Sequence, residues 1–163
     1  MWASAVTAWA HYLSYAAMAA ALTIEHLTLK PEPTVKEGWR LVVADSIYGV
    51  AAITVLATGV LRLLYFAKGS EYYMHQPLFW VKVSLYGVVG VLSIYPTISF
   101  LSWIGGLRAD KPPTLAAGRA KLLQWLVRGE LLGMALIPLM ASLMARGVGS
   151  RLVCFLKEAQ DWG

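Results

Sequence analysis

The sequence VSLYGVVGVLSIYPTISFLSWIGGL, residues 83–107, runs for 25 residues without Asp, Glu, Lys, Arg or His. A helix that crosses the roughly 30 Å hydrocarbon core of a bilayer needs about 20 mostly apolar residues. Residues 2–24 and 46–61 also lack Asp, Glu, Lys and Arg, and a fourth apolar stretch, residues 122–145, contains only two charged residues. Four such stretches in 163 residues predict an all-α integral membrane protein, a four-helix bundle.

The composition agrees with a membrane protein and argues against a soluble protein, a nucleic-acid-binding protein and a thiol-based metal site. Hydrophobic residues make up 58% of the chain and charged residues 14%, which leaves little to cover a water-exposed surface. The 14 Lys and Arg exceed the 9 Asp and Glu, but they lie mainly between the apolar stretches, so we expect no nucleic-acid partner. The single cysteine, Cys154, has no partner for an internal disulfide, and a thiol-based metal site lacks ligands.

The chain is predicted to form one membrane domain over residues 1–163. Its four helices are expected at about residues 3–24, 41–66, 77–104 and 122–145. Pro31 and Pro33 end the first helix because proline lacks an N–H donor, and Pro77 opens the third at a position that tolerates proline. Residues 146–163 place apolar side chains on one face, so this tail is expected to lie along the membrane interface.

Basic residues predict the orientation of the chain in the membrane. The first and third connections and their flanks contain Lys30, Lys36, Arg40, Arg108, Lys111, Arg119 and Lys121. The other side contains fewer, namely Lys68, Arg146, Arg151 and Lys157. Because basic connections stay on the cytoplasmic side, both termini are expected on the lumenal or periplasmic face.

Polar residues in the predicted helices recur every three or four positions, so each set shares one helix face. The sets are Ser4, Thr7, His11, Ser14 and Met18; Asp45, Tyr48, Gly59 and Arg62; and Lys82, Tyr86, Gly90, Ser93 and Thr97. Contact between polar side chains and lipid is unfavourable, so we expect these faces to point into a bundle with a partly polar interior. Gly129 and Gly133 are expected to pack the fourth helix closely against a neighbouring helix.

Arg128 and Glu130 are the most unusual pair of charges, because too few uncharged residues follow Glu130 to span a membrane. Both charges are therefore expected within the membrane-embedded length, on different helix faces. One interpretation is a structural network of ion pairs, in which Glu130 meets Lys82 or Arg62, while Arg128 extends toward the basic third connection or meets Asp45. The alternative is a proton or ligand site.

His11 is the only histidine well inside a predicted helix, since His26 and His75 are at helix ends. A neutral imidazole ligates haem iron or shuttles protons, so His11 is the predicted metal ligand. No second histidine lies at the same depth, which disfavours bis-histidine ligation and leaves the sixth position open or filled by Lys82. The alternative is a histidine that makes only structural hydrogen bonds.

Four motifs in the predicted helices resemble those of a known family. They are Ala44-Asp45-Ser46-Ile47-Tyr48-Gly49, Thr58-Gly59-Val60-Leu61-Arg62, Phe79-Trp80-Val81-Lys82-Val83 and Leu92-Ser93-Ile94-Tyr95-Pro96-Thr97. The chain is similar in these motifs to an uncharacterised membrane-protein family, domain of unknown function 2214, of bacteria, cyanobacteria and plant plastids. The resemblance implies a four-helix membrane protein of a plastid or thylakoid membrane or a bacterial inner membrane. It implies no activity, because none is established for that family.

More distantly, three features resemble the four-helix membrane protoporphyrinogen oxidases of the HemJ type. They are His11 in the first helix, the Trp80-Val81-Lys82 opening of the third helix, and Arg128-Gly129-Glu130 in the fourth. In that group a first-helix histidine and a membrane lysine are associated with b-type haem and with activity. The resemblance implies those roles for His11 and Lys82.

The leading hypothesis from the sequence is a tetrapyrrole-associated redox protein that binds haem b. Its cofactor-binding residues would be His11, Lys82 and Arg62, with Arg62 neutralising a propionate, and its catalytic residues Lys82 and Glu130. The alternatives are a non-catalytic accessory subunit or assembly factor of a larger photosynthetic or respiratory membrane complex, and a small transporter. Whether the chain is an enzyme is left open. Its expected partners are membrane lipids, together with other membrane subunits or further copies of the chain.

Overall fold

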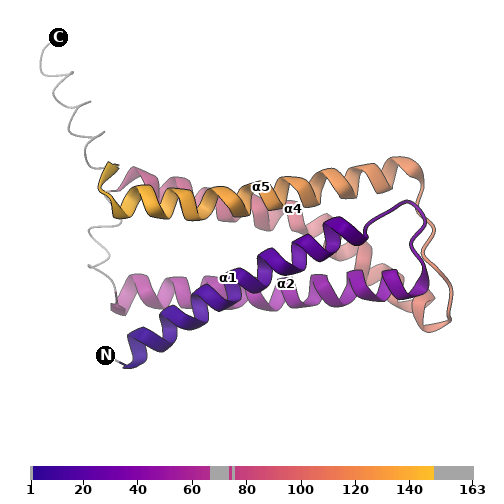
Figure 1. Cartoon of the computed structure of the whole chain (residues 1–163), viewed down its shortest axis with the longest axis horizontal. Coiled ribbons are helices and arrows are strands. Elements are labelled where there is room, and N and C mark those ends of the chain that lie inside the picture. Colours follow the sequence, from indigo (N-terminus) through magenta and orange to yellow (C-terminus); the bar gives the residue numbers. More distant parts are fainter. Residues whose placement is uncertain (1, 67–73, 75, 149–163) are drawn as a thin grey trace, which may run out of the picture.

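The computed structural model describes residues 2–66, 74 and 76–148, and all regular structure in these residues is helical. The helices are α1 (Trp2–Thr28), α2 (Val35–Leu61), a turn of π-helix η1 (Arg62–Phe66), α4 (Pro77–Arg108) and α5 (Ala117–Ala145). The predicted all-α fold with four long helices is confirmed (Figure 1). The tail predicted at the membrane interface falls almost entirely outside the described residues.

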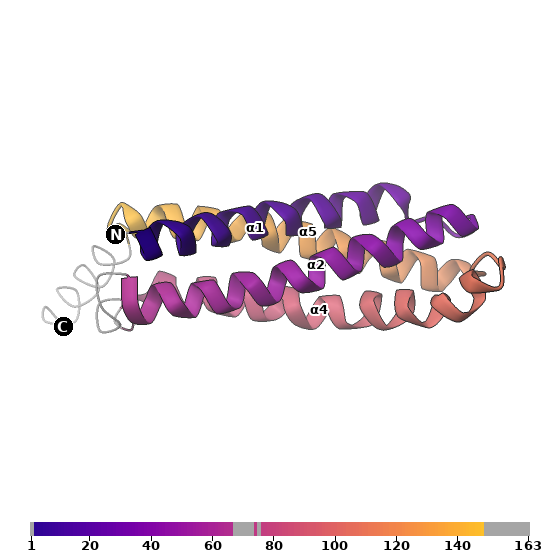
Figure 2. The ribbon, with the colours of Figure 1, turned by 90° about the horizontal axis from the view of Figure 1, so that it is seen from below.

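The four long helices run side by side as two antiparallel hairpins (Figure 1 and Figure 2). Helix α1 packs mainly on α2, and α4 mainly on α5, while fewer contacts between α2 and α4 and between α1 and α5 join the hairpins. The start of α1 and the end of α5 lie at one end of the bundle, which we call the terminal end (Figure 1). The connections at residues 29–34 and 109–116 lie at the opposite end, the connection end.

All four helices continue further towards the connection end than hydropathy predicts. Helix α1 ends at Thr28 instead of residue 24, and α2 begins at Val35 instead of residue 41. Helix α4 ends at Arg108 instead of residue 104, and α5 begins at Ala117 instead of residue 122. Hydropathy marks only the part of a helix that suits the hydrocarbon layer, whereas backbone hydrogen bonding continues into the polar layer. Several basic residues assigned to the connections therefore lie on helix ends.

The start of α2 shows how a helix begins outside the apolar stretch. Thr34 is the N-cap: its hydroxyl accepts a hydrogen bond from the Glu37 N–H at 3.3 Å, and its own N–H donates to Glu37 Oε2 at 2.8 Å. This reciprocal capping box satisfies two N–H groups that the first helical turn leaves without partners. Lys30 Nζ lies 2.7 Å from Glu37 Oε1, so an ion pair joins the preceding connection to the helix.

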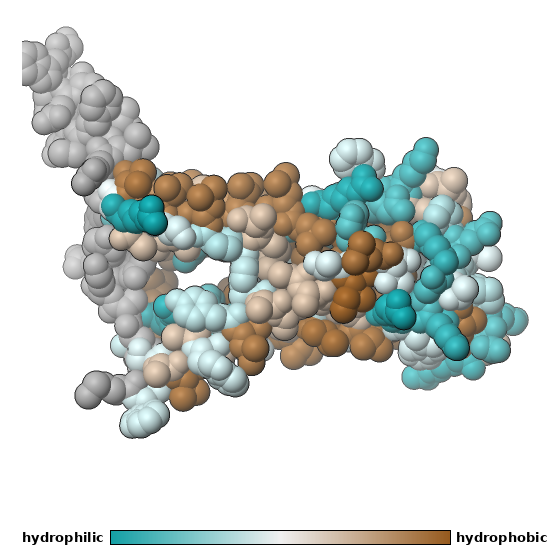
Figure 3. Space-filling model, in the orientation of Figure 1, coloured by the Kyte–Doolittle hydropathy of each residue, from teal (hydrophilic) through white to brown (hydrophobic). Residues whose placement is uncertain are grey.

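Three helices of the described part are long and apolar enough to cross a membrane, at Val35–Tyr65, Pro77–Arg108 and Ala117–Ala145. Helix α1 has 27 residues, but its many alanine, threonine, serine and aromatic residues are less apolar than the leucine and valine of the other helices. It packs along α2 and forms the fourth helix of the bundle. Hydrophobic atoms cover the middle of the molecule and hydrophilic atoms gather at the connection end (Figure 3). These features fit an integral membrane bundle.

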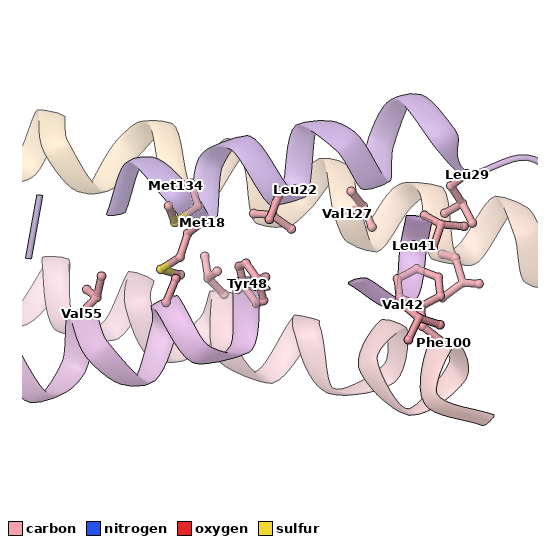
Figure 4. Packing of buried hydrophobic residues seen from close by; sticks show 14 of the residues in the cluster. Met18, Leu22, Leu29, Leu41, Val42, Tyr48, Val55, Phe100, Val127 and Met134 are labelled. Carbon is pink, nitrogen blue, oxygen red and sulfur yellow. The ribbon is translucent and has the colours of Figure 1, made fainter. Parts of the chain in front are cut away.

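The core contains side chains from all four long helices. Met18 of α1, Phe100 of α4 and Val127 of α5 are fully or almost fully buried, and Figure 4 shows them between the ribbons with their neighbours. The glycine ridge of α5 packs as predicted. A Cβ added at Gly133 would come closer than 3.0 Å to Val89 of α4, so only glycine allows this approach of the two helices.

Candidate functional site

His11 of α1 is fixed by a hydrogen bond to α2. Its Nδ1 lies 2.9 Å from Thr58 Oγ1. The Thr58 hydroxyl itself donates to the Thr54 carbonyl oxygen at 2.6 Å, so its only proton is already used. We therefore assign the proton of the neutral ring to Nδ1, which donates to Thr58. The lone pair on Nε2 is then left for another partner.

Arg62 and Lys82 bring positive charge close to this imidazole from two further elements. Arg62 stands at the start of η1, where its Nη2 donates to Tyr12 Oη at 3.3 Å and its guanidinium lies 5.0 Å from the centroid of the Tyr12 ring. Lys82 of α4 is half-buried, with its Nζ 5.5 Å from the centroid of the Phe79 ring. Both cations are close enough to His11 to interact with it electrostatically. The structure therefore brings together the three residues predicted to bind a cofactor.

The helix geometry around this basic cluster, which we define as His11, Arg62 and Lys82, is irregular. The π-helical turn η1 begins at Arg62, and π-turns inside helical segments frequently occur at functional sites because they redirect side chains. One turn earlier, a Cβ added at Gly59 would lie 3.5 Å from His11 Cε1, so the ring of His11 rests directly against the α2 backbone. Helices α1 and α2 are thus close together at the level of the cluster.

A second polar group lies in the core and contains three carboxylates from three helices. The exposed fractions are 1% for Glu25 of α1, 5% for Asp45 of α2 and 1% for Glu130 of α5. Asp45 Oδ1 accepts a hydrogen bond from Thr97 Oγ1 at 2.7 Å, and the Tyr48 hydroxyl is within hydrogen-bonding reach of Glu130. Glu25 is close enough to the other two carboxylates to interact with both. We call Glu25, Asp45 and Glu130 the acidic cluster.

The acidic cluster corrects the expectation of ion pairs at Asp45, Arg128 and Glu130. Arg128 is exposed on the outer face of α5, where its guanidinium lies 5.7 Å from the centroid of the Trp125 ring. Among the described residues the one ion pair joins Lys30 to Glu37, so none of the three forms the expected pair. Arg128 and Glu130 are two positions apart on the helix, so their side chains face different directions. Glu130 faces the bundle interior, and Arg128 faces the outer surface.

Sequence reasoning did not make Glu25 a candidate site residue, because it expected the first helix to end at about residue 24. The helix continues to Thr28, and Glu25 extends the polar face of His11, Ser14 and Met18 by two further turns. This spacing along one helix face is the feature of the sequence that could have identified Glu25. The predicted catalytic residues Lys82 and Glu130 do not share a site, because Lys82 belongs to the basic cluster and Glu130 to the acidic cluster.

The two described histidines, His11 and His26, belong to no multidentate metal site among the described residues. In residues 2–66, 74 and 76–148, no three His, Cys, Asp or Glu side chains are arranged to hold a metal ion. His26 is 15 residues from His11 on the same helix, or about 22 Å along its axis. His75 and Cys154 lie outside the described residues. Among the described residues, His11 is thus the one histidine at its depth in the bundle that could ligate a metal.

A family model described as "Predicted membrane protein (DUF2214)" matches residues 3–149, which is most of the chain. No curated protein and no solved structure matches it. The match agrees with the resemblance found in the helix motifs and with the membrane character of the bundle, and its description names no activity.

Proposed function

We propose that this protein, which belongs to the DUF2214 family of predicted membrane proteins, is a small integral membrane protein that holds a b-type haem or related tetrapyrrole at His11. The hydrogen bond between His11 Nδ1 and Thr58 is the observation that carries the proposal. Histidines that ligate a metal through one ring nitrogen usually donate from the other, which fixes the ring orientation. Nε2 of His11 has the free lone pair that axial ligation requires.

The surroundings of His11 suit an anionic tetrapyrrole. Its propionates carry negative charge, and Arg62 and Lys82 supply positive charge from η1 and α4 beside the imidazole. Figure 3 shows an opening between the two hairpins in the half of the bundle nearer the terminal end. His11 is the tenth residue of α1 and belongs to the same half. A planar ring system could enter there from the lipid.

Each residue of the basic cluster has a role in this proposal. Thr58 orients the imidazole, His11 ligates, and Arg62 neutralises a propionate while Tyr12 holds its guanidinium. Lys82 is a second ligand or a proton donor. The haem would supply one-electron transfer. Glu130 is outside this site and has no part in it.

The test is the absorption spectrum of the protein purified from cells supplied with a haem precursor. We expect a Soret band from the wild-type protein, its loss in His11→Ala, and its retention in His26→Ala, a matched change on the same helix. Thr58→Val should keep the band but weaken haem retention, because the imidazole loses its orienting partner. A colourless wild-type protein, or an unchanged haem content in His11→Ala, would refute the proposal.

The cellular context is part of the same proposal. The basic residues of both connections gather at the connection end, which is hydrophilic in Figure 3. We therefore place that end on the cytoplasmic or stromal side of a bacterial inner membrane or a plastid membrane. Partner subunits are expected on the apolar outer surface. A colourless protein that co-purifies with a photosynthetic or respiratory complex would favour the accessory-subunit alternative instead.

A further inference from the structure

The acidic cluster is unusual because its carboxyl groups form no ion pair in the part of the chain that the structure describes. Glu25, Asp45 and Glu130 come from α1, α2 and α5 and are at least nine-tenths buried. None of them is in the ion pair between Lys30 and Glu37, which is the one that the described residues contain. Carboxylates removed from water in this way are normally paired, hydrogen-bonded to donors or protonated.

The cations inside the bundle are too far away to compensate the cluster. Asp45 and Arg62 are 17 residues apart on one continuous helical segment, or about 25 Å along its axis. Lys82 lies with Arg62 in the basic cluster, because the two interact electrostatically. Arg128 is on the outer face of α5. The interior of the protein therefore separates its positive and negative charges along the bundle.

Two oxygen atoms provide a second, independent observation. Glu25 Oε1 and Glu130 Oε1 are buried and have no hydrogen-bond partner among the described residues. Both side chains are only 1% exposed, so bulk water does not reach them. A buried carboxylate oxygen without a donor is costly, whereas a carboxylic acid can share its proton with a neighbouring oxygen. Each orphan oxygen is thus suited to receive or carry a proton.

Besides the imidazole of His26, the other groups near the cluster supply hydroxyls. Tyr48 of α2 is within hydrogen-bonding reach of Glu130 and Ser93, and Thr97 of α4 donates to Asp45. Tyr86 of α4 donates to the Ala52 carbonyl oxygen at 2.7 Å. His26 follows Glu25 on α1, with a buried Nδ1 that also lacks a partner in the described part of the chain. Hydroxyls can both donate and accept, which suits the transfer of protons.

We propose that Glu25, Asp45 and Glu130 form a proton-binding site inside the membrane bundle, which holds at least one proton at neutral pH. The proton is held by the carboxyl group of one of these residues, with Thr97 donating to Asp45 Oδ1 and the Tyr48 hydroxyl near Glu130. The ligand is a proton rather than a metal ion, because no three acidic or histidine side chains of the described residues have the arrangement of a metal site. This site does not depend on haem at His11.

Infrared spectroscopy of the protein in nanodiscs at neutral pH tests the proposal. We expect a C=O stretching band of a protonated carboxylic acid, which shifts in D2O. Glu130→Gln or Glu25→Gln should remove or displace it, whereas Glu37→Gln, at a partly exposed carboxylate paired with Lys30, should leave it unchanged. Glutamine has the shape of a protonated glutamate, so these variants should remain folded. Asp45→Asn offers a third variant.

Two results would overturn the proposal. One is the absence of any carboxylic acid band in the wild-type protein at neutral pH. The other is loss of the band when Na+, K+ or Ca2+ is added, which would make the cluster a cation site. His11→Ala should retain the band, so failure of the haem proposal and failure of the proton site give different results.

Discussion

Replacing Gly133 by Ala adds one methyl group at the contact between α5 and α4. The new Cβ would come closer than 3.0 Å to Val89 Cγ2, a separation that real Cβ atoms essentially never show. Carbon atoms in van der Waals contact are about 3.5–4.0 Å apart, so the two atoms must move by at least about 0.5 Å. Val89 cannot easily turn away, because a β-branched side chain in a helix has one strongly preferred rotamer.

The expected loss of stability follows from this overlap. Overpacking a close-packed contact costs about 1–3 kcal/mol, and the better helix propensity of alanine returns up to about 1 kcal/mol. We therefore expect Gly133→Ala to lower the free energy of unfolding by about 1–2 kcal/mol. Gly129, one turn away on the same helix, is the matched control. A Cβ there would lie 3.4 Å from Leu92 Cδ1, at the edge of ordinary contact, so Gly129→Ala should be nearly neutral.

The measurement is reversible unfolding in mixed micelles, followed by circular dichroism. Val89→Ala removes the methyl group that Gly133→Ala meets, so the double variant should recover much of the loss, as a double-mutant cycle would show. Equal stability of Gly133→Ala and Gly129→Ala would refute the close approach of α4 and α5. If the double variant loses as much free energy of unfolding as the two single variants together, the overlap caused by Gly133→Ala is not with Val89.

Three further predictions use other parts of the chain. Thr34→Ala removes the capping box of α2 and should lower the free energy of unfolding by about 0.5–2 kcal/mol, measured in the same micelles; an unchanged value would mean that the cap is not needed. Arg128→Gln should change the free energy of unfolding by less than about 0.5 kcal/mol, because the side chain is exposed and forms no ion pair among the described residues. A large loss of stability would mean that Arg128 forms the ion pair that the sequence suggested. Cys154 should react with a membrane-impermeant thiol reagent from the periplasmic or lumenal face, and labelling from the cytoplasmic face alone would reverse the orientation.

The sequence by itself determined the helices and their faces. Apolar length predicts four helices, and the three- or four-residue spacing of polar residues places His11, Arg62 and Lys82 on interior faces. It also predicts that Arg128 and Glu130 face different directions. These properties depend on residues close together in the chain, so local hydropathy and helix geometry are enough to decide them.

The tertiary structure alone decided which residues lie near Glu130. The sequence suggested that Glu130 would find a basic partner, but the packing of α1 against α5, and of α2 against α1 and α4, places it near Glu25 and Asp45 instead. The relative depth of residues on different helices depends on where each helix ends, on its tilt and on side-chain contacts such as the one between Gly133 and Val89. No single helix contains that information, because an offset of one turn, about 5 Å, exchanges one set of neighbours for another.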